Sequence, residues 1–441
     1  MKAFLIGTIL MFVIALFGSA YSVGRNFSML ELAEQSDVVF VGKVTDVADD
    51  TATVSVTEVL SGELDSNSLV VSPVHVQECI GSSIVFSIGE QALIFGKNSA
   101  DRQVTVTASG EGTIKLGTKS REMEIEAAKR ILEIVPLNEH EKNEAMLAEV
   151  RSQNARLRSE SRHYIVARIS HSDLRDNYKD NFVSLIWDTN PEIQRTGLQG
   201  IQFVRAQDAI PRMVELTRSE DLGVVSEASM ALGRYDTQES VSALIALTKH
   251  ENPQIRIRAC IDLDDSIRPE AKEALKRLLD DNNPKVRAMA PRGLVYWLRR
   301  NEADDVLPKL EEMLNDGDAE VRSAAANQLG ECQNSEPVIA LLAALKKQPQ
   351  DENMKRWILQ SLYRHYGRGD AKAKELIDRD IQEIVLALKS GDPNYDFGPS
   401  FEAVGILGLS RKVEAKDALR WASESHPNME IRAYAQRCLL K

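Results

Sequence analysis

The sequence has 441 residues, with few cysteines, few aromatic residues and no run of basic residues. The four cysteines (Cys79, Cys260, Cys332 and Cys438) include no Cys-x-x-Cys pair, which excludes the common zinc and redox motifs. Aromatic residues make up only 5% of the chain, which favours helix packing through small residues. The net charge of -12 and the lack of a basic patch argue against binding to nucleic acid or anionic lipid.

One long apolar run is present, over residues 3–17. Gly18-Ser19-Ala20 follows it, the pattern of small residues that a signal peptidase cleaves. We therefore expect residues 1–20 to be a cleaved signal peptide and the protein to be periplasmic or secreted. The alternative is an uncleaved anchor, because residues 3–23 are just long enough to span a bilayer. In that case the protein would stay on the inner membrane and face outward.

Residues 27–120 are expected to form a small β-barrel. A short helix at 29–35 precedes segments rich in β-branched residues at 37–47, 52–60, 69–76, 91–95 and 103–107. Five strands at this spacing predict a closed barrel. Residues 23–120 carry 13 acidic and six basic residues, a net charge of -7, which argues against the oligonucleotide binding common in such barrels.

Three sequence stretches in this region carry a resemblance to a known family. They are 36–44 (SDVVFVGKV), 56–63 (VTEVLSGE) and 86–95 (FSIGEQALIF), with Cys79 between the last two. In this order they resemble bacterial domains related to the tissue inhibitors of metalloproteinases (TIMP-like), which have an OB-type barrel. The resemblance implies an OB-like fold and raises protease inhibition as an alternative function. True inhibitors of that family use an N-terminal Cys to chelate the protease zinc, and no Cys stands near Tyr21, where the mature chain would begin.

Residues 121–160 are expected to be a helical connector. Apolar residues at helical spacing predict helices over 121–135 and 139–159, separated by Pro136. Their charged residues are expected to form a solvated face, so the connector is interpreted as a spacer that braces the barrel against the following region.

From residue 161 to residue 441 the sequence repeats. An apolar residue, here called the anchor, follows a loop of Asn, Asp or Pro and opens a helix of small and apolar residues. Three steps of 31 residues separate the first four anchors, and steps of 35, 33, 45 and 32 follow. The anchors are Ile193, Val224, Ile255, Val286, Val321, Met354, Pro399 and Ile431. A second apolar helix lies between anchors, so the pattern predicts a two-helix unit repeated about eight times.

These units resemble short bacterial HEAT repeats, which implies an all-α, HEAT-like α-solenoid behind the barrel and a multidomain α+β protein. When successive units stack, they bury apolar surface that a single unit would leave exposed. Asn or Asp before each anchor is expected to cap its helix, with Pro191, Pro253 and Pro284 in the first turn. Cys260, Cys332 and Cys438 fall in different units, beyond the ~7 Å reach of a disulfide, so we expect four buried thiols.

Four arginines recur directly after an anchor: Arg256, Arg287, Arg322 and Arg432. They could form a basic stripe for an acidic partner, or a ladder in which each arginine pairs with Asp or Asn of a neighbouring unit. The recurrence in step with the repeat favours the ladder.

The 45-residue step is the main irregularity of the array. It contains an unusual concentration of aromatic and basic side chains, and insertions in solenoids often lie on the binding surface. The candidate binding residues are Tyr363, Arg364, His365, Tyr366, Arg368, Tyr395 and Phe397. The alternative is that this repeat is distorted and its aromatic residues fill the resulting gap.

Catalytic patterns are absent from the sequence. None of the seven histidines lies in an HExxH motif, and no nucleophile elbow or phosphate-binding loop is present. His140-Glu141 and His250-Glu251 resemble the iron-binding pairs of a HEAT-repeat hydroxylase, but such a site needs four pairs on facing helices. We therefore expect no catalytic residues, no metal and no cofactor.

The preferred function is an exported, non-enzymatic scaffold that binds a protein or peptide through the solenoid. The alternatives are a protease inhibitor acting through the barrel, and an enzyme that uses a metal or a small molecule on the helical array.

Overall fold

The structure is a computed structural model that describes residues 28–48, 51–64, 66–72, 88–99, 103–106, 113–117, 120–169, 177–347, 351–390 and 398–440. The predicted signal peptide, Cys79, Tyr395 and Phe397 lie outside the described residues. The chain divides into two compact units, Met1–Asn181 and Phe182–Lys441. The boundary therefore lies within the region predicted as solenoid.

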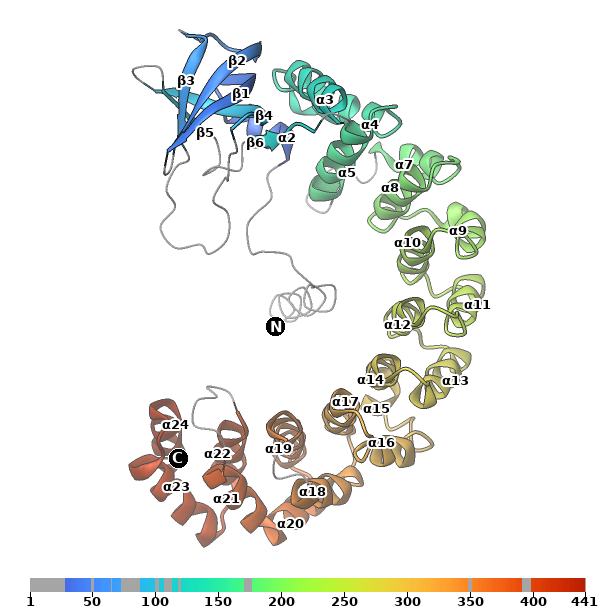
Figure 1. Cartoon of the computed structure of the whole chain (residues 1–441). Helices are drawn as coiled ribbons and strands as arrows, with labels where there is room; N and C mark the ends of the chain where they lie inside the picture. The colour runs from blue at the N-terminus through green and yellow to red at the C-terminus, as the bar shows by residue number, and fades with distance from the viewer. Residues whose placement is uncertain are drawn as a thin grey trace. The chain divides into compact units, whose positions relative to one another are not determined.

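The first unit contains the predicted closed barrel (Figure 1). Its strands are β1 (Val38–Ala48), β2 (Thr51–Ser61), β3 (Ser68–Ser72), β4 (Gln91–Ser99) and β5 (Gln103–Val106), and a short β6 (Thr113–Lys115) pairs with β4. The order β1-β2-β3-β5-β4 is closed by antiparallel pairing of β1 with β4, and β3 and β5 are parallel. The five predicted strands are confirmed; β6 was not predicted, because three residues give too short a pattern.

The barrel core follows the alternation of its strands. Phe40, Val54, Leu69, Ile94 and Val104 are buried together inside it. Side chains of one strand point alternately to the two faces of the sheet, so the β-branched and aliphatic residues that marked the strands also fill the core.

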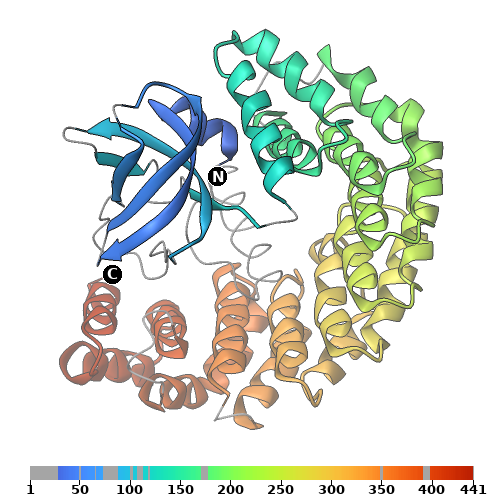
Figure 2. The same cartoon turned by 45° about the horizontal axis from the view of Figure 1, so that its top comes forward.

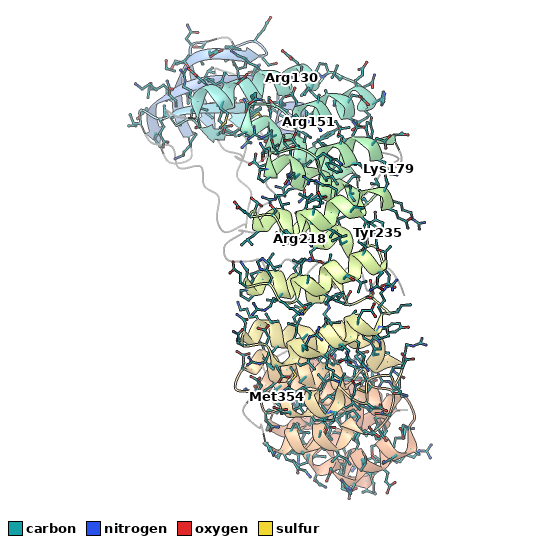
Figure 3. All side chains as sticks on the ribbon, turned by 90° about the vertical axis from the view of Figure 1, so that its right-hand side faces the viewer. Arg130, Arg151, Lys179, Arg218, Tyr235 and Met354 are labelled. Atoms are coloured by element: carbon teal, nitrogen blue, oxygen red, sulfur yellow. The ribbon has the colours of Figure 1, made fainter. Side chains whose placement is uncertain are left out.

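Among its described residues, the first unit also contains the helices α2 (Met29–Glu34), α3 (Arg121–Ile134), α4 (Glu139–Glu149) and α5 (Ala155–Ile169). Met29 N donates to Glu160 Oε2 of α5 at 2.8 Å, and Lys129 of α3 pairs with Glu58 of β2 at 2.7 Å. Arg130 of α3, labelled in Figure 3, pairs with Glu149 of α4 at 2.7 Å. The connector helices therefore pack with the barrel in one unit.

The prediction of a single helix over 139–159 is wrong. Helix α4 ends at Glu149 and α5 begins at Ala155. The side chain of Asn154 accepts hydrogen bonds from Arg156 N and Leu157 N at 3.0 and 3.2 Å. Asn154 thus accepts hydrogen bonds from the free N–H groups at the start of a new helix. The sequence pattern did not reveal this helix start, because polar residues continue through it.

The second unit is an array of helix pairs. The anchor helices are α8 (Pro191–Ile201), α10 (Leu222–Leu232), α12 (Pro253–Asp262), α14 (Pro284–Gly293), α17 (Ala319–Leu329), α19 (Glu352–Gly367), α22 (Pro399–Leu409) and α24 (Met429–Leu439). Each packs on the next one along the chain. They follow one another along the inner side of the curve that this unit draws in Figures 1 and 2, and we call this side the inner face.

The second helices form the outer row of the same unit (Figure 1). They are α9 (Ile210–Leu216), α11 (Gln238–Leu247), α13 (Pro269–Arg277), α16 (Leu307–Met313), α18 (Pro337–Lys347), α20 (Ala371–Arg379), α21 (Ile381–Ser390) and α23 (Val413–Ser425). The short helix α15 (Val295–Arg299) follows the anchor helix α14 directly and packs against α14 and α17. Helix α7 (Lys179–Leu185) precedes them, and short 3-10 turns lie at Gln207–Ala209 and Leu278–Asp280.

The predicted caps explain the regular phase. Asn190, Asp221, Asn252, Asn283 and Asp318 each accept a hydrogen bond at the N-terminus of an anchor helix, as do Asp351 and Asn428. The anchors Val224, Val286, Val321 and Met354 are completely buried; Met354 is labelled in Figure 3. One cap and one anchor therefore set where these seven pairs begin, whereas α22 begins after Gly398, which provides no side-chain cap.

The 45-residue step contains a longer anchor helix and an extra outer helix. Helix α19 has 16 residues, whereas its neighbour α17 has 11. Two outer helices, α20 and α21, then follow where most repeats have one. The irregular spacing thus reflects an enlarged repeat within the same array.

Candidate functional site

The arginines that follow the anchors form the predicted ladder. Nε and Nη2 of Arg256 donate to the two oxygens of Asp281, both at 2.7 Å. Arg287 binds Asp316 in the same way, at 3.0 and 3.0 Å. The third rung joins Arg322 Nη2 to Asp351 Oδ2 at 2.9 Å. These three side chains are committed to neighbouring repeats, so the ladder is confirmed for Arg256, Arg287 and Arg322. For Arg432, on the terminal helix α24, the described residues show no such bond, and its place in the ladder stays a prediction.

Each of the four arginines also donates a hydrogen bond to a backbone carbonyl in the loop that precedes its own helix. Arg287 Nη1 donates to the Asp281 carbonyl at 2.8 Å, and Arg432 binds the His426 carbonyl in the same way at 2.6 Å. The bond from Arg287 lowers the pKa of Asp316, which burial alone would raise. The carboxylate is therefore held in its charged form, as an ion pair between repeats requires.

Two histidines play a structural part at the same loop position. His250 Nδ1 accepts from Asn252 N at 3.0 Å, and His426 Nδ1 accepts from Asn428 N at 3.1 Å. In a neighbouring repeat Asp281 does the same for Asn283 N at 2.9 Å. The His250-Glu251 pair is thus part of a loop that positions a helix cap.

His140 belongs to the other His-Glu pair of the sequence, His140-Glu141, and lies in the first unit at the start of α4. Its Nδ1 is 3.3 Å from the hydroxyl of Tyr178. Across the described residues, no group of three or more His, Cys, Asp or Glu side chains is arranged to hold a metal ion.

The cysteines of the array differ in burial. Cys260 and Cys332 are buried free thiols, and burial raises the pKa of Cys332 to about 12. Cys438 is only partly buried, in contrast to the expectation, because it lies on the terminal helix α24, which has no repeat after it among the described residues.

Three candidate binding residues contact other parts of the array; His365 and Tyr366 are buried, whereas Arg368 is exposed. His365 is 2% exposed, with Nε2 3.1 Å from the Leu329 carbonyl. The hydroxyl of buried Tyr366 donates to Asp378 of α20 at 3.1 Å. Arg368 donates to the backbone carbonyls of Gly330 and Cys332. These contacts join the enlarged repeat to its neighbours, as the gap-filling interpretation describes; their role in binding stays a prediction.

Tyr363 and Arg364 occupy a different position. Both belong to α19, where Tyr363 is 36% exposed. Arg364 Nη1 donates to Asn327 Oδ1 of α17 at 3.0 Å and lies 3.1 Å from Glu331 Oε1. These two residues remain accessible along the junction of α19 with its neighbours.

Sequence reasoning missed the residues that surround Tyr363. Partly exposed aromatic and arginine side chains continue over three successive anchor helices, α19, α22 and α24. We call this surface the aromatic face and define it as Arg356, Trp357, Tyr363, Phe401, Tyr434 and Arg437. Trp357 and Tyr434 both stand three residues after an anchor, so the repeat phase already contained a signal for them.

The aromatic face is held together by ring contacts. Phe401 and Tyr434 stack with centroids 4.6 Å apart, which joins α22 to α24. A Cβ placed on Gly405 would lie 3.1 Å from the ring of Tyr363 and 3.4 Å from the Tyr434 hydroxyl. Glycine therefore allows both tyrosines to approach α22 closely.

The charges near this face are unevenly compensated. Burial raises the pKa of Glu402 on α22, although Arg356 and Arg364 oppose the change, and Gln360 donates to its carboxylate at 3.4 Å. Burial also raises the pKa of Tyr434 to about 12. The arginines are the main permanent charges exposed there.

A second set of buried charges lies in an earlier repeat, at the end of α12. Ser229 donates to Asp262 at 2.6 Å, and Arg258 pairs with the same carboxylate. Burial next to Asp265 raises the pKa of Asp264 to about 6. This acidic cluster has its own internal partners.

The described part of the chain contains no helix long and apolar enough to cross a membrane. The fold itself is a stacked array of helix pairs, a class of protein that acts as an interaction scaffold. The profile of the HEAT repeat family matches residues 180–250, 241–317 and 279–363. The array is therefore HEAT-like, and its matched part consists of HEAT repeats.

The chain is similar to several solved structures at low sequence identity. An engineered protein has 18% identity and a TM-score of 0.41, over 72% of this chain and 95% of that one. Escherichia coli YibA has 13% identity and a TM-score of 0.41, over 61% and 97%. The complex of CpcE and CpcF of phycocyanin lyase from Nostoc sp. PCC7120 has 15% identity and a TM-score of 0.34, over 54% and 94%. A comparison with curated protein sequences finds no match.

Proposed function

We propose that the protein is an exported, non-enzymatic scaffold that binds another protein or a peptide through the inner face of its helical array. The observation that carries the proposal is the aromatic face, where Trp357 and Tyr363 of α19, Phe401 of α22 and Tyr434 of α24 remain partly exposed on successive anchor helices. Exposed aromatic and arginine side chains are the types that dominate the binding energy of protein interfaces. In a chain with 5% aromatic residues, their concentration here supports a role in recognition.

Photocrosslinking in the native host tests this function. A photoreactive amino acid replaces Ala324, a partly exposed residue of the anchor helix α17. The control position is Ile339 on the outer helix α18, which is 56% exposed. We expect discrete crosslinked protein species from position 324 and none from position 339. Equal labelling at both positions, or no product at either, would contradict binding through the inner face.

The export part of the proposal rests on residues 1–20. An apolar run that ends in Gly18-Ser19-Ala20 has the form of a signal peptide. Mass spectrometry of the protein isolated from its host is expected to give Tyr21 as the first residue. An intact N-terminus with the protein in the membrane fraction would support the outward-facing anchor, and an intact N-terminus in the cytosol would contradict export.

For the barrel, the strand order supports an OB-type module and keeps protease inhibition as the second candidate function. The closure of β1 on β4 and the parallel pairing of β3 with β5 are the specific observations in its favour. The inhibitor hypothesis predicts that the processed protein slows a zinc metalloprotease at equimolar concentration. Unchanged cleavage of a fluorogenic peptide by a panel of such proteases would remove this candidate.

A further inference from the structure

Within the part of the chain that the structure describes, two arginines of the aromatic face form no close ion pair. Arg356 lies over the ring of Trp357 at 5.3 Å, and Arg437 lies over the ring of Tyr434 at 5.7 Å. Neither guanidinium lies within 4.0 Å of a described carboxylate; Arg356 interacts with Glu402 only through longer-range charge attraction, and its Nε is buried without a hydrogen-bond partner. Ladder arginines such as Arg287, in contrast, are saturated by carboxylate and carbonyl oxygens.

The ring contacts help to position these guanidinium groups for binding. A guanidinium over an aromatic face keeps N–H donors for another partner, and two such donors match a carboxylate in parallel hydrogen bonds. In Arg356 these donors are the Nη groups, because its Nε is buried. Trp357 and the stacked pair of Phe401 and Tyr434 also offer apolar surface beside the charges. Such surface excludes water and strengthens a neighbouring ion pair.

The spacing of the arginines favours a row of carboxylates over a single anion. Arg356 and Arg364 are eight residues apart on α19, which corresponds to about 12 Å along the helix axis. Arg437 lies two anchor helices farther on, and packed helices are about 8–10 Å apart. A phosphate group is too small to contact arginines so widely spread. An extended peptide advances about 3.3 Å per residue, so acidic side chains about five or six residues apart match the roughly 16–20 Å between helices two positions apart in the array.

From these observations we infer that the aromatic face binds an extended acidic segment of a partner protein. Aspartate or glutamate side chains of the segment pair with Arg356 and Arg437, and an apolar side chain between them packs against Trp357 or Phe401. The complementary charge is the reason for this choice, since the partly exposed Arg356 and the exposed Arg437 lie on one face of a chain whose net charge is -12. The inference rests on the proposed function and specifies its partner.

Selection from a random library of displayed 12-residue peptides, with the full chain as bait, tests this chemistry. We expect the enriched peptides to contain an excess of Asp and Glu over Lys and Arg, together with an apolar or aromatic residue. Their affinity, measured by fluorescence anisotropy, is expected to fall at least tenfold between 50 and 500 mM salt. An enriched set without acidic bias, or no enrichment at all, would overturn the inference.

Matched variants locate the site. Arg356→Glu combined with Arg437→Glu is expected to weaken binding more than tenfold, and Trp357→Ala about tenfold. The controls are Arg420→Glu, a change at an exposed residue of the outer helix α23, and Trp187→Ala. Trp187 is 62% exposed and also carries an arginine, Arg212, over its ring at 4.9 Å, but it lies outside the aromatic face. Circular dichroism checks that every variant is folded.

The possible results separate the inference from the proposed function. Control variants that weaken binding as much as the test variants would contradict the aromatic face as the site. A singly phosphorylated peptide with no other acidic residue, bound more tightly than the acidic peptides, would replace the acidic segment with a phosphopeptide. If position 324 crosslinks to a partner while the selection shows no acidic preference, the scaffold function stands and this inference fails.

Discussion

At the scale of single residues, the distance from the anchor decides what an arginine does. One residue after an anchor, Arg287 is enclosed between two repeats and completes the hydrogen bonding of a loop. Two residues after an anchor, Arg356 reaches the accessible side of its helix and stacks on Trp357. Because successive residues are rotated by about 100° around a helix, a shift of one position separates a structural side chain from a candidate binding side chain.

The first prediction concerns the ladder. Arg287→Ala removes a bidentate pair with Asp316 whose side chains are 21% and 15% exposed, and it should lower the free energy of unfolding by about 1–3 kcal/mol. Arg299→Ala is the control, because the pair of Arg299 with Glu331 has its arginine 58% exposed and should contribute less than about 1 kcal/mol. Urea unfolding measures both. Equal losses would mean that the ladder is no stronger than a surface ion pair.

The second prediction concerns pH. Burial lowers the pKa of His365 to about 4 in the folded protein, against 6.5 in the unfolded chain. Between these values the unfolded state binds more protons, so this residue makes the protein less stable as the pH falls from about 6.5 to 4. Asp264, with its pKa raised to about 6, acts in the opposite direction, and the test must therefore compare variants.

His365→Gln is the informative variant, because it removes the titrating group and keeps a polar side chain near Leu329. We expect the fall in unfolding free energy between pH 7 and pH 5, measured by urea titration, to be smaller in this variant than in the unchanged protein. The slope attributable to one histidine is at most about 1.4 kcal/mol per pH unit. Identical pH profiles would show that the imidazole remains free to protonate in the fold.

At the scale of elements, the close approach of anchor helices depends on small residues. A Cβ placed on Gly330, at the end of α17, would lie 2.4 Å from Ser361 Oγ and 2.9 Å from its Cα on α19. Distances this short require one helix to move. The alanines and glycines behind the low aromatic content are thus the residues that allow the helices to stack.

The third prediction follows from this contact. Gly330→Ala should destabilise the protein by about 1–3 kcal/mol through overpacking. Gly367→Ala, at the end of α19, is the control because a Cβ there would meet nothing within 4 Å. Thermal unfolding followed by circular dichroism distinguishes the two. A neutral result for Gly330→Ala would show that α17 and α19 can separate without loss.

At the scale of the whole molecule, the chain consists of two compact units, each with its own core. Phe40 is completely buried in the barrel, and Leu362 is completely buried in the array. Independent cores predict independent unfolding, which a single free energy cannot describe.

The fourth prediction uses these two residues. Calorimetry should resolve two transitions; Phe40→Ala should lower the temperature of one and Leu362→Ala that of the other. Cavities of this kind cost about 3–5 kcal/mol for Phe and about 2–5 kcal/mol for Leu. A single transition that moves in both variants would show that the units unfold together.

Much of this organisation was predictable because it depends on local periodicity. The strands followed from alternating β-branched residues, and the repeats followed from a cap and an anchor in constant phase. The break between α4 and α5 was missed, since Asn154 interrupts a polar pattern that otherwise continues. The candidate site was predicted only in part: Tyr363 is exposed, whereas His365 and Tyr366, one turn or less away, are buried.

By itself, the sequence determined that this protein has a small β-barrel and a HEAT-like array, because alternation, caps and repeat spacing are properties of neighbouring residues. The scarcity of aromatic residues and the abundance of small ones were already in agreement with stacked helices. Only the tertiary structure decided which arginines are enclosed in a ladder and which lie uncovered beside Trp357 and Tyr434. That choice depends on contacts between residues 25 to 29 positions apart, which appear only when successive helices pack.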